Sequence, residues 1–243
     1  MLAEINEFLH VPISGTLAID ATNAMGMAES CRNKRLHESM CSYDHLLPDG
    51  RPLLWLVRAK GHALQDVIDG PHLLDRVLSG LERPTKVAVI GGYPDQHEQI
   101  REASEIRYPR AVYSLMYDAP PGEIDPAYVA EAVRLIEGSG AELVFICLGV
   151  PRQYYWTALA KTMLPGRVYL SVGGAFLYMT GQASMPPDWV QRSGLWWLYR
   201  LYKQPRRLWR RYMRYNALFL WFLFTREIWP GRSRSRSSPG TKR

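Results

Sequence analysis

The sequence predicts an α/β protein built on a mostly parallel sheet with helices on both faces, followed by an amphipathic helical appendage at the C-terminus. Short apolar, β-branched runs alternate along the chain with stretches of helical periodicity, which is typical of βαβ units. The 243 residues include 47% apolar residues, enough for one domain with a substantial core. A sheet of this kind is covered by helices on both sides.

The apolar runs define five expected strands, and the stretches between them define five expected helices. The strands are Thr16–Asp20, Lys86–Ile90, Ala111–Met116, Glu142–Leu148 and Val168–Val172. The helices lie near residues 52–60, 71–81, 95–106, 126–137 and 153–163.

Glycine follows three of the expected strands, as Gly91 and Gly92, as Gly149, and as Gly173 and Gly174. Ligands of parallel sheets bind beyond the carboxyl ends of the strands. Glycine there allows a phosphate or a sugar to approach the backbone, and the N-terminus of a following helix favours an anion. A tight turn would explain the same glycines. Neither a GxGxxG motif nor a Walker loop is present, so ordinary dinucleotide and P-loop sites are weakly supported.

Several polar side chains near these strand ends could carry chemistry. Asp49 stands in a proline–glycine turn after a short apolar stretch, where it could act as a general base or simply cap the turn. Thr22 and Asn23 follow the first strand and could bind a sugar or diphosphate, or cap the next helix. Gln153 can both donate and accept hydrogen bonds near a helix start.

Charge is distributed very unevenly along the chain. Residues 200–243 contain 13 Lys or Arg and one acid, a net charge of +12, whereas residues 1–199 contain 17 basic and 22 acidic residues, a net charge of −5. We therefore divide the chain into a core over residues 1–194, a basic amphipathic appendage over 195–229 and a disordered Arg/Ser tail over 230–243. Such a tail indicates an anionic partner, either phospholipid or nucleic acid.

The appendage favours the phospholipid. Pro205 should begin a new helix, and five arginines in residues 206–214 alternate with aromatic and aliphatic residues, which is typical of a helix lying in an anionic membrane interface. Docking of this helix on the protein core is the alternative. The longest apolar run, residues 217–224, is eight residues long, too short to span a bilayer, and we expect no secretory signal and no nucleic-acid partner.

Metal chemistry has little support in the sequence. The histidines lack HExxH-like spacing, no DxD-type acidic pair is present, and Cys31, Cys41 and Cys147 have no metal-binding spacing. We therefore expect no metal, no other cofactor and reduced thiols in a cytosolic protein.

Together, these segments resemble the WecG/TagA/CpsF family of bacterial glycosyltransferases from about residue 16 to residue 224. The resemblance is carried by an ordered set of motifs: Ala21–Ala24, Leu47–Pro52, Gly70–Leu74, Val89–Gly92, Leu148–Gln153, Val172–Phe176, Gly181, Gly194–Leu201 and Pro205–Tyr212.

The resemblance implies an α/β fold built on a Rossmann-like sheet, and an inverting transfer from a UDP-sugar to a polyprenyl-diphosphate-linked saccharide. The enzyme would be peripheral, at the cytoplasmic face of the bacterial inner membrane, and homo-oligomers are plausible. Asp49 would be the catalytic base, and Thr22, Asn23 and Gln153 would line the site. Arg200, Arg207 and Arg210 would cover the diphosphate, with Arg206 and Arg211 as possible substitutes.

Four positions depart from the family pattern. Tyr154, Leu177 and Trp196 stand where the family usually has glutamate, aspartate and glutamate, and Val67 stands where it commonly has arginine. We expect altered donor specificity rather than loss of activity, with a neutral hexose such as glucose favoured and a role in exopolysaccharide biosynthesis. Transfer of N-acetylmannosamine or its uronate is the alternative, and a non-catalytic membrane adaptor of polysaccharide assembly is the rival outside enzymes.

Overall fold

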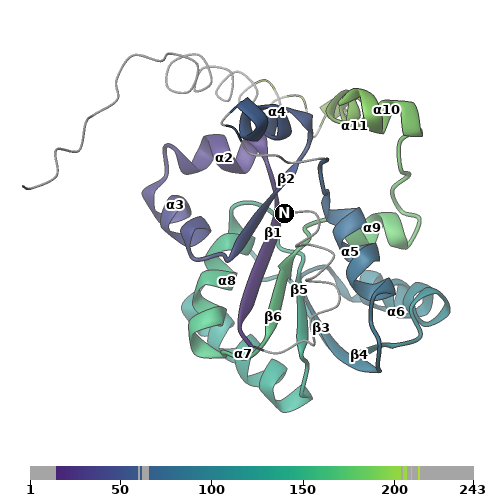
Figure 1. Ribbon diagram of the computed structural model, residues 1–243. Coiled ribbons are helices and arrows are strands. Elements are labelled where there is room, and N and C mark those ends of the chain that lie inside the picture. The colour runs from purple at the N-terminus through teal and green to yellow at the C-terminus, as the bar shows by residue number, and fades with distance from the viewer. Residues whose placement is uncertain are drawn as a thin grey trace, which may run out of the picture.

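The computed structural model describes residues 15–59, 61, 66–203, 205, 206, 209 and 213, without the side chains of residues 188 and 192 (Figure 1). Its strands form one six-stranded sheet in the order β2-β1-β6-β5-β3-β4, and every pairing is parallel. This confirms the predicted α/β class. The strands are β1 (Leu17–Asn23), β2 (His45–Asp49), β3 (Thr85–Ile90), β4 (Ala111–Tyr117), β5 (Leu143–Ile146) and β6 (Val168–Ser171).

The edge strand β2 was not expected from the sequence. It pairs only with β1, and its short run His-Leu-Leu-Pro-Asp contains Pro48, which discourages a strand prediction. An edge strand tolerates proline, because one side of its backbone is not needed for pairing within the sheet. Asp49 is therefore the last residue of a strand and not part of a turn, which corrects the expectation for its local structure.

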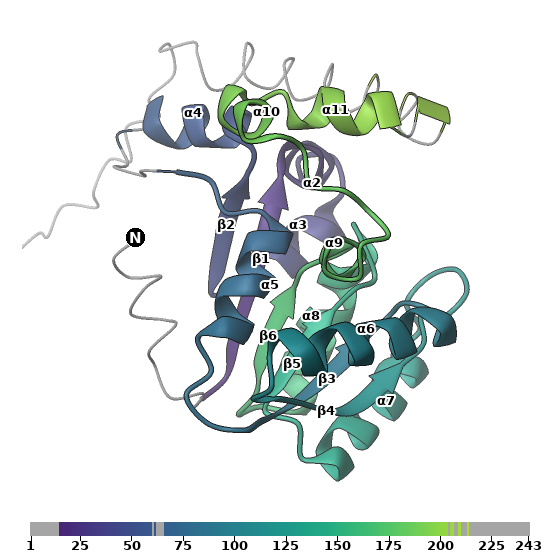
Figure 2. The same ribbon diagram turned by 90° about the vertical axis from the view of Figure 1, so that its right-hand side faces the viewer.

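Helices cover both faces of the sheet, as predicted (Figures 1 and 2). On one face, the core includes side chains of α5 (Gly70–Ser79), α6 (Pro94–Arg107) and α9 (Ala175–Met179). On the other, it includes side chains of α3 (Lys34–Cys41), α7 (Pro126–Ser139) and α8 (Arg152–Met163). Each of the five expected helices is present, as α4 (Arg51–Ala59), α5, α6, α7 and α8.

A third layer lies beyond the carboxyl ends of β1 and β2 (Figure 2). It consists of α4 (Arg51–Ala59), α10 (Asp188–Ser193) and α11 (Trp196–Lys203), with α2 (Ala24–Ser30) just below. Helix α11 ends before Pro205, where the sequence predicts a new helix, and Pro205, Arg206, Trp209 and Met213 are helical. The rest of the predicted appendage lies outside the described residues, which contain no helix both long and apolar enough to cross a membrane.

Candidate functional site

The carboxyl group of Asp49 stands at the edge of the sheet where the strands end. Asp49 lies two residues after Leu47, which belongs to the core on the α5 face, so alternation along β2 points Asp49 to that same face. Its neighbour in the pairing register is Asn23 at the end of β1. The last residues of two parallel strands therefore meet here, as expected of a ligand site in such a sheet.

The surroundings of Asp49 disfavour its charged form. Although the residue as a whole is only partly buried, desolvation of its carboxyl group raises the pKa from 3.8 to about 7, and the negative charges of Asp69 and Asp20 add to this shift. The positive charge of Arg200 acts in the opposite direction. A carboxyl group with a pKa near neutrality can take up a proton during a reaction and release it afterwards.

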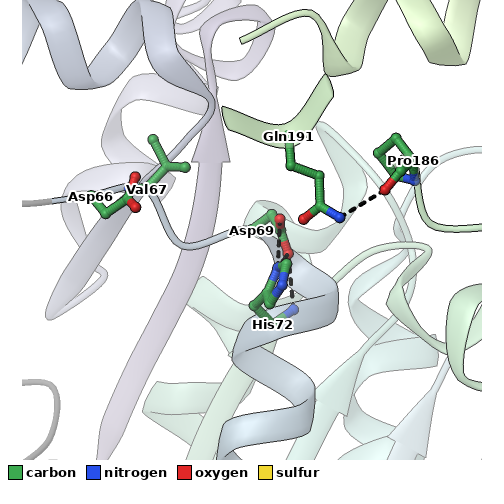
Figure 3. Close-up of polar contacts among 6 residues, drawn as sticks. All are labelled: Asp66, Val67, Asp69, His72, Pro186 and Gln191. Atoms are coloured by element: carbon green, nitrogen blue, oxygen red, sulfur yellow. Dashed lines mark hydrogen bonds and ion pairs between the residues drawn. The ribbon is translucent and has the colours of Figure 1, made fainter. Parts of the chain in front are cut away.

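Asp69 links this edge to the start of α5 (Figure 3). It is 6% exposed and caps the helix by accepting the backbone N–H of His72 at 2.9 Å. Its carboxylate also lies 2.7 Å from Nδ1 of His72, and this contact is the main cause of the raised pKa of His72. Helix α5 can approach β6 closely because residue 70 is glycine, where a Cβ atom would lie 2.7 Å from the carbonyl oxygen of Val172.

Helix α11 brings a cation to these acids. The ring of Trp196 meets His72 edge-on at 6.4 Å and Tyr178 at 6.2 Å, which fixes the start of the helix over α5 and α9. Four residues later, Arg200 is close enough to lower the pKa of Asp49. The structure therefore brings Arg200 and Asp49 together, whereas Arg207 and Arg210, with their possible substitute Arg211, lie outside the described residues.

Behind this edge, Asp20 forms the centre of a buried polar cluster. Its side chain is 0% exposed and receives hydrogen bonds from the Thr22 hydroxyl, from Nε2 of Gln153 at 2.6 Å and from the Tyr154 hydroxyl at 2.5 Å. Desolvation raises the pKa of Asp20 to about 6, and the three hydrogen bonds oppose this rise. Thr22 and Gln153, both predicted to line the site, thus bind the same carboxylate and are themselves 2% and 4% exposed.

Asn23 caps a helix, which is one of the two roles considered for it from the sequence. Its side-chain oxygen accepts the backbone N–H of Gly26 at 3.0 Å and so begins α2. The amide nitrogen remains at the strand end beside Asp49 in the pairing register, where it can still donate to a ligand.

A pocket of about 200 Å³ opens near the ends of β3, β5 and β6. Three of the predicted glycines, Gly92, Gly173 and Gly174, line it together with Arg152 and Leu177. Gly149 is not among its lining residues. It has φ +71° with open space where a Cβ atom would stand, and its carbonyl oxygen accepts the backbone N–H of Gln153 at 2.9 Å.

Gly91 has a different role, because its backbone packs against β5. A Cβ atom at residue 91 would lie 2.8 Å from the backbone of Cys147, and φ is +109°. The structure therefore explains this glycine by close packing, although the sequence suggested contact with a ligand.

We expect Gly91→Ala to destabilise the fold by at least about 2 kcal/mol, because it combines an unfavourable φ with a backbone clash. For a chain of this size this corresponds to a melting temperature lower by roughly 4–8 °C. Gly138→Ala is the matched control, since Gly138 lies in α7 with nothing within 4 Å of an added Cβ atom. Equal melting temperatures for the two variants would contradict the packing role of Gly91.

The four departures from the family pattern fall in different surroundings. Tyr154 is fully buried beside Asp20, Leu177 lines the pocket, and Trp196 packs on His72. Val67 is partly buried, and its backbone N–H donates to Asp66 at 2.8 Å (Figure 3). Leu177 is thus the departure that touches the pocket directly.

Sequence reasoning missed Asp20, Asp69 and His72. Asp20 had a usable signal, because a single acid interrupts an otherwise apolar strand, and buried charges are rarely placed without a partner. Asp69 becomes recognisable only when β2 and α5 come together, through the hydrogen bond from the N–H of Ile68 to the carbonyl of Pro48 at 3.2 Å.

Despite these acids, no group of three or more His, Cys, Asp or Glu side chains within the described ranges is arranged to hold a metal ion. The charged groups that act on one another at this edge are the carboxylates of Asp49 and Asp69 and the guanidinium of Arg200.

Comparison with known proteins adds to this geometry. Residues 1–233 match the glycosyl transferase WecG/TagA/CpsF family. One relative, the N-acetylglucosaminyldiphosphoundecaprenol N-acetyl-beta-D-mannosaminyltransferase of Bacillus spizizenii, is 27% identical over 203 residues, which cover 81% of this chain and 74% of the relative. The family match includes the whole parallel sheet and its acidic edge, and the chain belongs to the WecG/TagA/CpsF family of glycosyltransferases.

Proposed function

We propose that this glycosyltransferase moves a hexosyl unit from a UDP-sugar to a polyprenyl-diphosphate-linked saccharide, with Asp49 as the general base. The observation that carries the proposal is Asp49, a partly exposed residue at the edge of the sheet whose desolvated carboxyl group has a pKa raised to about 7, with Arg200 as a nearby counter-charge. The name of the Bacillus relative supports a lipid-diphosphate acceptor.

The chemistry requires one base and a stabilised leaving group. A hydroxyl of the acceptor attacks the anomeric carbon on the face opposite UDP, and its proton passes to the carboxylate of Asp49. The bond from the anomeric carbon to the UDP oxygen breaks, so the sugar inverts its configuration and UDP leaves with an additional negative charge. Arg200 is suited to stabilise that charge, because a guanidinium group binds diphosphate oxygens in a bidentate manner, and no metal ion is required for this step.

The donor contacts would extend from Asp49 to the glycine-lined pocket. Gly92, Gly173 and Gly174 leave room for a sugar nucleotide close to the backbone. Leu177 makes part of that lining apolar where the family pattern has an acid, which favours a neutral hexose such as glucose. The relative's name favours N-acetylmannosamine instead, so both donors belong in the test.

We place the enzyme at the cytoplasmic face of the bacterial inner membrane, within exopolysaccharide biosynthesis. Exposed aromatic and apolar side chains on the helical layer support this placement: Trp55, Trp189, Leu198, Tyr202, Trp209 and Met213. The net charge of +12 over residues 200–243 should attract anionic lipid.

The enzyme should therefore sediment with phosphatidylglycerol vesicles and remain in solution with phosphatidylcholine vesicles. Added salt should weaken the binding to anionic vesicles, because screening reduces the attraction. Equal binding to both vesicle types at low salt would contradict an electrostatic attachment.

The experiment that tests the function measures UDP release by the full-length protein. Vesicles carry short polyprenyl-diphosphate saccharides, and the donors are UDP-glucose, UDP-N-acetylmannosamine and its uronate. We expect release that depends on the acceptor and on one donor. No release with any donor, from folded protein that binds the vesicles, would favour the membrane-adaptor alternative.

A further inference from the structure

Asp20 is an unusual residue for the interior of a parallel sheet. It lies two residues after Ala18, a core residue on the α8 face, so its carboxylate points to the side of the sheet opposite Asp49. It is completely buried and has no cationic side chain among its hydrogen-bond partners within the described residues, which are Thr22, Gln153 and Tyr154. Such a carboxyl group is costly to keep, and a hydrophobic residue would serve the core better.

The clearest effect of Asp20 is on the side chain of Gln153. An ionised carboxylate only accepts hydrogen bonds, so the amide of Gln153 must turn its NH₂ group toward Asp20, at the observed distance of 2.6 Å. This fixes the carbonyl oxygen Oε1 on the other side. Without Asp20, either end of the amide could face this position, because its NH₂ group and its carbonyl oxygen have nearly the same shape.

The carbonyl oxygen of Gln153 is left available. It is buried and has no hydrogen-bond partner among the described residues. Its direction is given by Gly173, where a Cβ atom would lie 3.8 Å from Oε1. Gly173 lines the pocket, so this buried acceptor lies directly behind a glycine of the pocket wall, where no side chain separates the two. Buried acceptors without partners are rare in folded proteins.

We infer that Asp20 is a positioning residue of the transfer site, which holds the amide of Gln153 so that Oε1 accepts a hydrogen bond from the bound sugar nucleotide. The inference rests on the proposed function. The ligand group must be a hydrogen-bond donor, either a hydroxyl of the sugar or an N–H of the base. Tyr154 and Thr22 hold the second carboxylate oxygen, Oδ2, in place.

The charge of Asp20 also acts on the reaction indirectly. It is one of the causes that raise the pKa of Asp49, although the two side chains leave the sheet on opposite faces. Removing this charge should therefore let Asp49 lose its proton at a lower pH.

The test compares Asp20→Asn with Tyr154→Phe in the full-length protein at pH 8.5. The Asp20→Asn substitution preserves the shape of the side chain but no longer dictates which end of the Gln153 amide faces it. The Tyr154→Phe substitution removes one hydrogen bond from the same carboxylate and leaves the bond to Gln153. We expect Asp20→Asn to weaken binding of the sugar nucleotide about 10-fold and Tyr154→Phe to leave it within about two-fold, with similar melting temperatures for both.

Calorimetric binding of UDP alone, UDP-glucose and UDP-N-acetylmannosamine distinguishes the two possible ligand groups. Weaker binding of UDP itself would place the contact on the nucleotide, at the N–H of the base or a ribose hydroxyl, and weaker binding of only the UDP-sugars would place it on the transferred sugar. The acid side of the pH–rate profile should also move to lower pH in Asp20→Asn. Unchanged affinity in Asp20→Asn would overturn the inference whatever the pH–rate profile, whereas a wild-type protein that binds no UDP compound would instead refute the proposed function.

Discussion

Asp49→Asn should lower the rate of sugar transfer by roughly 10²- to 10⁴-fold, the range expected when a general base is removed. Asparagine keeps the shape of the side chain but does not take up the proton of the attacking hydroxyl. In the wild-type enzyme the rate should rise with pH through about 7, as Asp49 loses its proton. The variant's residual rate should lack this rise. UDP release under saturating donor and acceptor measures both effects.

The same substitution should not destabilise the protein, which separates loss of chemistry from loss of fold. The folded state holds a proton on Asp49 more tightly than the unfolded state does, because the pKa is about 7 instead of 3.8. The free energy of unfolding of the wild type therefore falls as pH rises between these two values. At pH 8 Asp49→Asn should unfold at a higher temperature than the wild type, and at pH 4 the difference should be small. A variant with normal turnover would refute the assignment of the base.

Arg200→Ala should lower the maximal rate on the order of 10²-fold, because it removes a cation from the developing charge on UDP. It should also move the acid side of the pH–rate profile to higher pH, since Arg200 holds down the pKa of Asp49. Both effects are read from the pH dependence of turnover at saturating donor.

Arg200→Lys is the matched control for this residue. Lysine keeps the charge and loses the bidentate geometry, so its pH profile should stay close to that of the wild type while the rate falls by a smaller factor. If Arg200→Ala retained the wild-type profile and rate, Arg200 would have no part in the site.

Much of the fold was predictable, because long helices and buried strands leave strong periodic signals. The exceptions are instructive. Strand β2 was hidden by its shortness and by Pro48, which an edge strand tolerates. Helices α2 and α3 were also not expected from the sequence. They are only seven and eight residues long, and each begins at an asparagine cap, Asn23 and Asn33.

The candidate site residues could be predicted where a single sequence motif contains them. They were harder to predict where they depend on contacts between separate segments of the chain. Asp49, Thr22 and Gln153 were named from local sequence and lie at or just behind the same edge of the sheet. Asp69 joins them only through the packing of α5 against β2.

The surroundings of Tyr154 in the fold change the interpretation that its sequence position suggests. In the sequence, Tyr154 stands where the family usually has glutamate, which suggests that the site has lost a carboxylate. In the fold its hydroxyl donates to Asp20 at 2.5 Å. A carboxylate is therefore present beside Gln153, supplied by β1 instead of α8.

Because the chain is synthesised from its N-terminus, the late position of Arg200 in the sequence has a consequence for incomplete chains. The strands that carry Asp20 and Asp49 leave the ribosome first, and α11 with Arg200 follows only after the whole sheet has emerged. A nascent or proteolytically shortened chain that ends before α11 thus contains Asp49 without Arg200. With the roles proposed above, such a chain would use nucleotide sugars on the order of 10²-fold more slowly, so an incomplete copy would consume little of the cell's supply of activated sugar.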